Sequence, residues 1–392
     1  MVFDMEHQPN PFMRSTGSPP KKFVGRTEEL KELKRALDYT ISGTPEHTIF
    51  FGPFGIGKTS LLIEFQKRIE NANTVFIRLY KTDNITEICD VILRESRFQL
   101  GFKENLTKKL RKNLTQVGFT LLGAGASLTL GKVEMNPQSA FKELISSIYD
   151  CLTKGSIFIL MIDDIHRITG KEGDGAATIL SVLSNVLLTL NQEEKRIMFV
   201  GTGSYDIFNQ LRSYDESSVR VFHPHEIKPL TSEEIIKVIV ESTRESKVEF
   251  SKEVIQKIYE LSEGNPYYVQ ILAYYAFEKQ ANKNVTMESF KVAFQKALNE
   301  LALKDFRKMY DDMSLGARKI LATMAESTKR NLRYSELQEG SQGIITSYLD
   351  ELIKGNAIVR EQRGSYRLRD KLFTQYLRTF KPYLQDGAKE ID

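Results

Sequence analysis

The sequence has few cysteines, little net charge and no long apolar run. Two cysteines, Cys89 and Cys151, among 392 residues argue against a disulfide framework and suit a reducing, cytoplasmic location. A net charge of +4 excludes a strong overall field for nucleic acid, so any basic surface must be local. The longest apolar stretch, 117–131, is too short and too rich in glycine to span a bilayer, so we expect no membrane partner. The first residues lack an apolar segment with a cleavage site, so we expect no signal peptide.

Internal repeats, low-complexity tracts and zinc-ligand patterns are absent as well. His223 and His225 have no cysteine or carboxylate pattern beside them that would complete a zinc site. Hydrophobic residues at 41% and charged residues at 27% are typical of a globular protein. At 392 residues, the chain is long enough for two or three domains.

Apolar runs alternate with helical patterns over the first 230 residues. An arm with four prolines and no periodicity is expected at 1–22. Strands are expected at 47–52, 74–80, 156–163 and 196–203. Alternating strands and helices are typical of a parallel sheet covered on both faces. The sequence therefore predicts an α/β core over 23–230. Within it, 81–147 match no pattern that we can assign, apart from a strand or hairpin at 125–135.

Helical signals replace strands after residue 230. Thr231 and Glu234 form a capping box that opens a helix. Gly264 can end a helix, Asn265 can cap the next one, and Pro266 fits its first turn. We therefore expect a helical domain without strands, the lid, over 231–312.

The pattern changes again at Met313. Helical segments are expected at 314–325, 333–338 and 341–355, and two strands are expected within 356–370 around a turn at Arg363-Gly364. Three helices followed by a hairpin are typical of a winged helix-turn-helix. We expect this domain over 313–382, before a tail at 383–392.

A glycine-rich loop follows the first expected strand and precedes a helical pattern. It fits the P-loop pattern G-x-x-x-x-G-K-[ST], and its residues are Gly52, Pro53, Phe54, Gly55, Ile56, Gly57, Lys58, Thr59 and Ser60. In such a loop, backbone N–H groups and the start of the helix surround the phosphates, Lys58 reaches the outer phosphates and Thr59 binds Mg²⁺. Because the loop stands between a strand and a helix, a chance turn is a poor alternative, and we expect ATP and Mg²⁺ as ligands.

The strand expected at 156–163 ends in two adjacent carboxylates. Asp163 is placed to hold the coordination shell of Mg²⁺ together with Thr59, and Asp164 to act as a base or orient the attacking water. By itself, "IDDIH" also fits a helix N-cap after a buried strand. The P-loop favours the catalytic interpretation, with Asp163, Asp164 and Lys58 at the catalytic centre.

Together these motifs resemble the AAA+/STAND group of P-loop ATPases, especially the archaeal-type and origin-recognition-like ATPases. The resemblance rests on FVGRTEEL (23–30), the P-loop, MIDDIH (161–166), FVGTGS (199–204), PLTSEE (229–234) and GNPYYVQ (264–270). It implies a P-loop core, a helical lid and a C-terminal winged helix, with ATP held between core and lid.

The resemblance also implies roles for further residues. Contacts to the base and ribose are implied for Val24, Gly25, Arg26 and Pro266. A sensor at the end of the fourth strand is implied at Thr202 or Ser204. Arg220 or Arg212 is implied as an arginine finger toward a neighbouring copy, although a solvated surface arginine explains either residue better.

Two positions depart from the family pattern, and both favour a switch over a motor. Many AAA+ machines place glutamate where this chain has Asp164, whose carboxylate is one methylene further from the water. A misplacement of about 1 Å can cost about 100-fold in rate. Origin-type initiators usually carry arginine after GNP, where this chain has Tyr267. We therefore expect slow hydrolysis.

The expected winged helix concentrates positive charge. Residues 313–380 contain 12 Lys+Arg and 7 Asp+Glu, a net of +5, against +4 for the whole chain. The candidate DNA contacts are Gln342, Thr346, Ser347, Arg360, Arg363, Arg367 and Arg369. Winged helices also dock proteins, however, and 341–354 has a single basic residue. A basic amphipathic segment at 103–114 is either a further contact to DNA or a partner, or a helix that packs on the domain with its basic face in solvent. We favour the packed helix.

The sequence thus predicts a Mg²⁺-dependent ATPase that binds ATP and ADP and acts as a nucleotide-controlled switch. Its leading target is double-stranded DNA, in replication, transposition or genome maintenance. The alternative is a STAND-type signalling scaffold, in which nucleotide controls self-association and the winged helix binds a protein partner.

Overall fold

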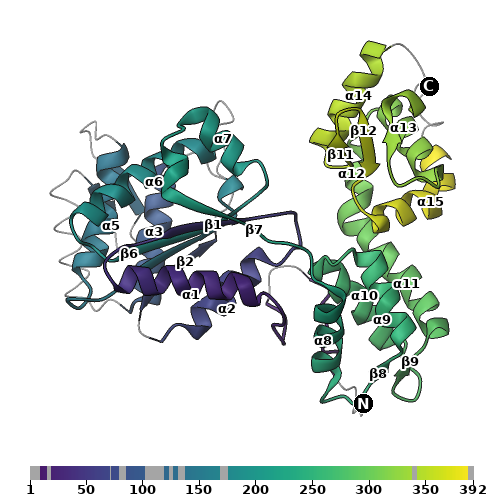
Figure 1. Cartoon of the computed structure of the whole chain (residues 1–392), viewed down its shortest axis with the longest axis horizontal. Helices are drawn as coiled ribbons and strands as arrows, with labels where there is room; N and C mark the ends of the chain where they lie inside the picture. Colours follow the sequence, from purple (N-terminus) through teal and green to yellow (C-terminus); the bar gives the residue numbers. More distant parts are fainter. Residues whose placement is uncertain are drawn as a thin grey trace. The chain divides into compact units, whose positions relative to one another are not determined.

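The protein divides into two compact units (Figure 1). The structure, a computed structural model, describes residues 9–15, 19–70, 72–78, 85–101, 119–122, 127–130, 137–167, 175–337 and 342–386. The sheet unit comprises Gly25–Lys228, and the C-terminal unit runs from Pro229 onward and includes the N-terminal segments 9–15 and 20–24. Among the helices in the described part of the chain, none combines the length and the apolar character needed to cross a membrane.

A five-stranded parallel sheet forms the centre of the sheet unit. Its strands are β1 (His47–Phe51), β2 (Asn73–Arg78), β5 (Phe158–Asp163), β6 (Ile197–Gly203) and β7 (Phe222–Glu226). They lie in the order β2-β5-β6-β1-β7, and each neighbouring pair is parallel. Every residue of β5 and β6 is buried. This burial confirms the predicted α/β class, since parallel strands need helices on both faces.

Two groups of helices cover the sheet (Figure 1). On one side lie α1 (Thr27–Ile41) and α2 (Lys58–Arg68). The other helices of the unit are α3 (Ile85–Gln99), α5 (Pro137–Asp150), α6 (Gly175–Gln192) and α7 (Ile207–Tyr214), which share one apolar core with the strands. Because all strands run in the same direction, their carboxyl ends and the turns that follow them meet at one edge of the sheet.

The sequence predicted four strands and missed β7. This strand reads Phe-His-Pro-His-Glu, and its burial does not follow an apolar run. It lies at the edge of the sheet, where Pro224 and exposed polar residues are tolerated because one side of the strand makes no ladder bonds.

Part of the segment that we could not assign, 81–147, forms a hairpin. Strand β3 (Phe119–Leu122) pairs antiparallel with β4 (Ser127–Leu130), which confirms a strand or hairpin near 125–135. The predicted basic helix at 103–114 lies outside the described residues.

The C-terminal unit begins with a group of helices. They are α8 (Ser232–Thr243), α9 (Lys252–Ser262), α10 (Pro266–Glu278) and α11 (Met287–Leu301), followed by a π-helical turn η3 (Ala302–Phe306) and α12 (Arg307–Asp311). The capping box at Thr231 is present, and Asn265 caps α10 with Pro266 in its first turn. The expectation of no strands here was wrong: β8 (Glu249–Phe250) pairs with β9 (Asn284–Val285). Two-residue strands are too short to leave a periodic signal.

A second group of elements completes this unit. It consists of α13 (Leu315–Glu326), β10 (Leu332–Arg333), α14 (Gln342–Lys354), β11 (Ile358–Gln362), β12 (Ser365–Leu368) and α15 (Lys371–Asp386). Strands β11 and β12 form the predicted hairpin, and Gly364 at its turn has a φ of 76°. The short helix predicted at 333–338 is confirmed in part, as a 3-10 helix at Tyr334–Glu336. Arg333 itself ends the short strand β10, which pairs with β12.

One continuous apolar core runs through the whole C-terminal unit. It begins with Leu230 and α8, passes through α10 and η3, and ends in α15. Phe12 of the N-terminal arm belongs to the same core, with its ring against Phe250 and Phe277. Residues 9–15 of the arm therefore pack on this unit, which their lack of periodicity did not predict.

Candidate nucleotide-binding site

The loop between β1 and α2 has the geometry of a phosphate cradle. Gly55 and Gly57 have φ values of 78° and 100°, which L side chains rarely adopt. Gly57 is the N-cap of α2 and makes no side-chain cap, so N–H groups of the first helical turn remain for an anion. The sequence pattern and the backbone geometry thus agree at this loop.

The ammonium of Lys58 lies against this loop. Its Nζ donates to the carbonyl oxygens of Gly52, at 2.8 Å, and Pro53, at 3.0 Å. Burial lowers the pKa of Lys58, while the charges of Asp164 and Asp163 act to raise it. The loop carbonyls hold the cation where an incoming phosphate can replace them as its partner.

Asp163 forms the centre of a hydrogen-bonded set at the carboxyl ends of the strands. Its side chain is fully buried. The hydroxyl of Thr59 donates to Oδ2 at 2.7 Å, and the hydroxyl of Thr202 donates to Oδ1 at 2.6 Å. A hydroxyl and a carboxylate in contact are hard oxygen donors of the kind that Mg²⁺ prefers. The predicted metal ligands, Thr59 and Asp163, are therefore side by side and fit the ion.

The strand order explains why Thr202 belongs to this set. β6 lies between β1 and β5, so its end stands between the P-loop and Asp163. Thr202 Oγ1 also accepts the backbone N–H of Asp164 at 2.8 Å. Thr202 thus fixes both aspartates, one by its hydroxyl proton and the other by its oxygen. Ser204, the alternative sensor, lies beyond the strand, and its carbonyl accepts from Ile207 at the start of α7.

Asp164 is held apart from Asp163 by its backbone and by neighbouring charges. Its φ is 57°, an uncommon conformation for a residue with a side chain. Arg167 Nε donates to its Oδ2 at 3.0 Å, and His166 Nδ1 lies 4.0 Å from Oδ1. Burial lowers the pKa of His166, although Asp164 opposes this. The predicted catalytic carboxylate is therefore ion-paired with Arg167, a residue that the motif analysis missed.

Arg78 is a second residue that the sequence analysis missed. It is the last residue of β2, directly beside Asp163 in the sheet register, and its Nε lies 3.6 Å from Asp163 Oδ2. Its position at the end of an expected strand could have marked it as a site residue. That position points to Asp163, however, only once β2 is known to lie beside β5.

The residues predicted to contact the base are divided between the two units. Arg26 is buried in the sheet unit, where it donates to the carbonyls of Ile56, at 2.8 Å, and Lys228. It therefore braces the P-loop. Gly25 belongs to the same unit. Val24 packs against the core of the C-terminal unit, and Pro266 also belongs to that unit.

The remaining loop residues differ in exposure, and the two arginine-finger candidates lie at the surface. Phe54 is 52% exposed, and Ile56 is buried. Arg220, in a 3-10 turn after α7, and Arg212, on α7, are both exposed.

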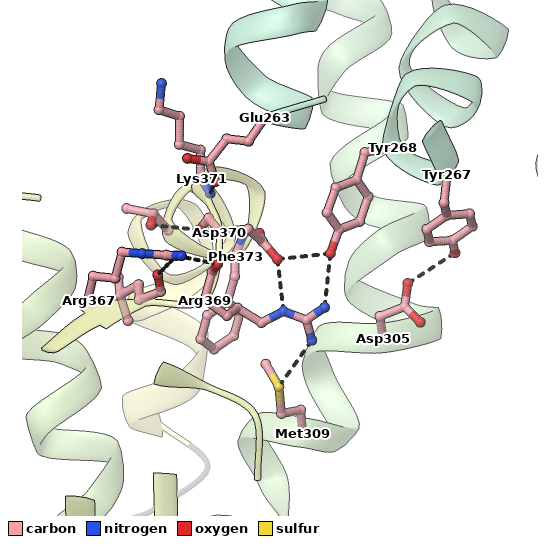
Figure 2. Close-up of polar contacts among 12 residues, drawn as sticks. Glu263, Tyr267, Tyr268, Asp305, Met309, Arg367, Arg369, Asp370, Lys371 and Phe373 are labelled. Atoms are coloured by element: carbon pink, nitrogen blue, oxygen red, sulfur yellow. Dashed lines mark hydrogen bonds and ion pairs between the residues drawn. The ribbon is translucent and has the colours of Figure 1, made fainter. Parts of the chain in front are cut away.

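The candidate DNA contacts fall into two classes. Thr346, Ser347, Arg360 and Arg363 are exposed, and Gln342 opens α14 with its side chain outside the described part. Arg367 is paired with Glu361 and donates to two carbonyls. Arg369 points into the unit, where it donates to Asp370 and Tyr268 (Figure 2). The guanidinium of Arg369 is only partly exposed and is engaged by these two side chains, so the DNA contact at this residue stays a prediction.

A parallel sheet with a P-loop after β1 and a Thr59–Asp163 pair at the same edge defines a P-loop nucleoside triphosphatase. Residues 23–272 match the family described as an ATPase domain predominantly from Archaea. The chain belongs to this family, which confirms the resemblance to archaeal-type ATPases.

Relatives and solved structures agree with this assignment. An ATP-binding protein of Methanocaldococcus jannaschii is 25% identical over 178 residues, which are 44% of this chain and 49% of the relative. An ATP-binding protein of Pyrococcus abyssi is 26% identical over 182 residues, 44% of this chain and 50% of the relative. The chain thus spans about half the length of the curated relatives it matches.

Two solved structures share the fold over nearly the whole chain. A Walker-type ATPase of Pyrococcus abyssi has a TM-score of 0.60 at 17% identity and covers 92% of this chain and 97% of its own. An ORC2 protein of Aeropyrum pernix, solved as ADPNP-ADP complexes, has a TM-score of 0.59 at 14% identity and covers 95% and 97%. At these identities the likeness concerns the fold.

Proposed function

We propose that the protein is a Mg²⁺-dependent ATPase that works as a slow, nucleotide-controlled switch. The observation that carries this proposal is the contact between Thr59, on the P-loop, and the buried Asp163, joined from the other side by Thr202. Family membership supports ATP as the nucleotide.

Each residue of the site has a distinct proposed part. Thr59 and Asp163 hold Mg²⁺, which neutralises phosphate charge when bound. Lys58 leaves the carbonyls of Gly52 and Pro53 and donates to the outer phosphates. Asp164 accepts a hydrogen bond from the attacking water and orients it, while Thr202 keeps the two carboxylates in register.

The surroundings of Asp164 support slow turnover. One oxygen of its carboxylate is already engaged by Arg167, and the side chain is one methylene shorter than glutamate. A protein that binds ATP readily and hydrolyses it slowly persists in a triphosphate state, as a switch requires.

The proposed target of the switch is duplex DNA, through a C-terminal winged helix formed by α13, α14, β11 and β12. Arg360 and Arg363 on the hairpin, with Lys354 at the end of α14, are exposed cations suited to phosphates. Replication, transposition and genome maintenance remain the proposed settings.

A specific observation favours the second candidate, a scaffold whose winged helix docks a protein. Thr346 and Ser347 share their face of α14 with Asp350 and Glu351. These carboxylates repel a phosphate backbone in the position where a recognition helix would enter the groove.

Single-turnover hydrolysis of ATP tests the enzymatic proposal. We expect Asp164→Asn to bind ATP like the wild type but to lose hydrolysis by about 100-fold or more, the scale associated with a misplaced catalytic group. Asp38→Asn, an exposed carboxylate on α1, is the matched control and should change neither property. Equal hydrolysis by the wild type and Asp164→Asn would remove Asp164 from the chemistry.

The salt dependence of duplex DNA binding separates the two targets. Three exposed cations predict a slope of log K against log salt of about −2.7. Arg360→Gln combined with Arg363→Gln should reduce this slope to about −0.9. If neither ATP-bound nor ADP-bound protein binds duplex DNA at low salt, the scaffold is the correct candidate.

A further inference from the structure

The turn between α9 and α10 is bonded to the last part of the chain (Figure 2). The hydroxyl of Tyr268, in the first turn of α10, donates to Asp370 Oδ2 at 2.9 Å and accepts from Arg369 at 3.2 Å. Arg369 Nε also donates to Asp370 Oδ2 at 2.8 Å. Three side chains, one from α10 and two from the segment between β12 and α15, thus form one closed set, which we term the Tyr268 lock.

Two residues beside the lock make parallel connections. Glu263, at the end of α9, accepts the backbone N–H of Lys371, at the start of α15, at 3.1 Å, and its other oxygen accepts from Arg330. Tyr267 donates to Asp305 in η3 at 3.0 Å. The segment that contains Pro266, the predicted base contact, therefore adjoins residues bonded to η3, to Arg369 and Asp370 after β12, and to α15.

The lock is costly to open because its groups are shielded from water. The exposed fractions are 3% for Tyr268, 17% for the Arg369 side chain and 11% for that of Asp370. Burial, and then the charge of Asp370, raise the pKa of Tyr268 well above its usual value, so its hydroxyl remains a donor. Separation of the helices would leave a buried ion pair without its bridging partner.

Aromatic packing joins the same elements. The ring of Phe306, in η3, lies 5.4 Å from that of Phe373 and 5.5 Å from that of Tyr376, both on α15. Phe306 and Phe373 are fully buried. The apolar core thus crosses the boundary between the predicted lid and the predicted winged helix.

We propose that α8 to α15 respond to nucleotide as one rigid body, with the Tyr268 lock preventing the predicted lid and winged helix from moving independently. A displacement at Asn265 and Pro266 would then reach α14, because a shared apolar core and the Tyr268 lock join the described elements between them. That nucleotide binding causes the displacement rests on the proposed function. The rigidity of α8 to α15 is independent of it.

Distances between two spin labels test the rigid body in the full chain. Val240→Cys on α8 and Ile344→Cys on α14 replace exposed residues, whereas the native Cys89 and Cys151 are buried. We expect one narrow distance distribution that is the same without nucleotide, with Mg²⁺-ATP and with Mg²⁺-ADP.

The variant Tyr268→Phe should broaden this distribution or add a second maximum. Tyr259→Phe, on α9, removes a hydroxyl that takes no part in the lock and should leave the distribution narrow. If Tyr268→Phe does not fold, Arg369→Lys keeps the buried charge, loses the planar fork and provides the same test.

The inference is overturned if the wild type has two distances, if its distance shifts with nucleotide, or if the lock variants stay as narrow as the wild type. Binding of radiolabelled ATP to the same samples is measured separately. If the wild type does not bind ATP, the proposed function is refuted. The distance distribution without nucleotide would still show whether α8 to α15 form one rigid body.

Discussion

The replacement Thr202→Val tests the hydrogen-bonded centre of the site. Valine keeps the shape of threonine but removes the hydroxyl that donates to Asp163 and accepts from Asp164. A hydrogen bond to a charged group contributes about 1.5–3 kcal/mol, and an unpaired buried amide adds about 1 kcal/mol to the loss. We therefore expect the free energy of unfolding to fall by about 3 kcal/mol.

Urea unfolding followed by circular dichroism measures this loss. For a unit of this size, about 3 kcal/mol corresponds to a shift of the urea midpoint by roughly 1 M. Thr202→Ser keeps the hydroxyl and should lose about 1 kcal/mol at most, from the missing methyl group. Thr189→Val is the matched control, since its hydroxyl donates to a carbonyl within α6.

Hydrolysis provides the second readout for the same variants. Without Thr202, Asp163 and Asp164 lose their common partner, so Thr202→Val should hydrolyse ATP more slowly than Thr202→Ser. If Thr202→Val has the wild-type urea midpoint and the wild-type rate of ATP hydrolysis, Thr202 contributes to neither stability nor hydrolysis, and the role given to it here is wrong.

Two further predictions concern stability. His47 is buried, accepts the N–H of Phe199, and has its pKa lowered by burial to about 3. Since the unfolded state binds the proton near pH 6.5 and the folded state does not, its contribution to stability is lost as pH falls from about 6.5 toward 3, by about 2 kcal/mol at pH 5. His47→Asn should therefore lose less stability than the wild type between pH 7 and pH 5 in urea titrations. Gly264→Ala should destabilise the C-terminal unit by about 2–3 kcal/mol, because Gly264 has a φ of 78° and a Cβ would lie 2.4 Å from the Leu230 carbonyl oxygen. Gly343→Ala, with nothing within 4 Å, is its control, and equal thermal midpoints for the two variants would contradict this account.

The motifs that lie within one stretch of chain were predictable. The P-loop needs glycines at fixed offsets before Lys58, and its chemistry follows from that spacing alone. Thr231 and Asn265 were recognised as caps because a cap depends on residues at most four positions away. The aspartate pair was recognisable at the end of an apolar run.

The failures share one feature, which is dependence on neighbours distant in sequence. β7 was missed because its Pro224 is acceptable only at a sheet edge, and no local pattern identifies the edge strand. Arg369 was predicted to contact DNA because of its charge, whereas Tyr268 becomes its partner only after α10 packs against the segment that follows β12.

The sequence by itself determined that the protein has a P-loop and two adjacent aspartates at the end of a buried strand, because each is encoded by local spacing. Only the tertiary structure decided that β6 lies between β1 and β5, which brings Thr202 to both aspartates and leaves Arg78 beside Asp163. Strand order in a parallel sheet depends on how helices pack on its two faces. This packing involves several segments at once, so no single segment of the sequence predicts it.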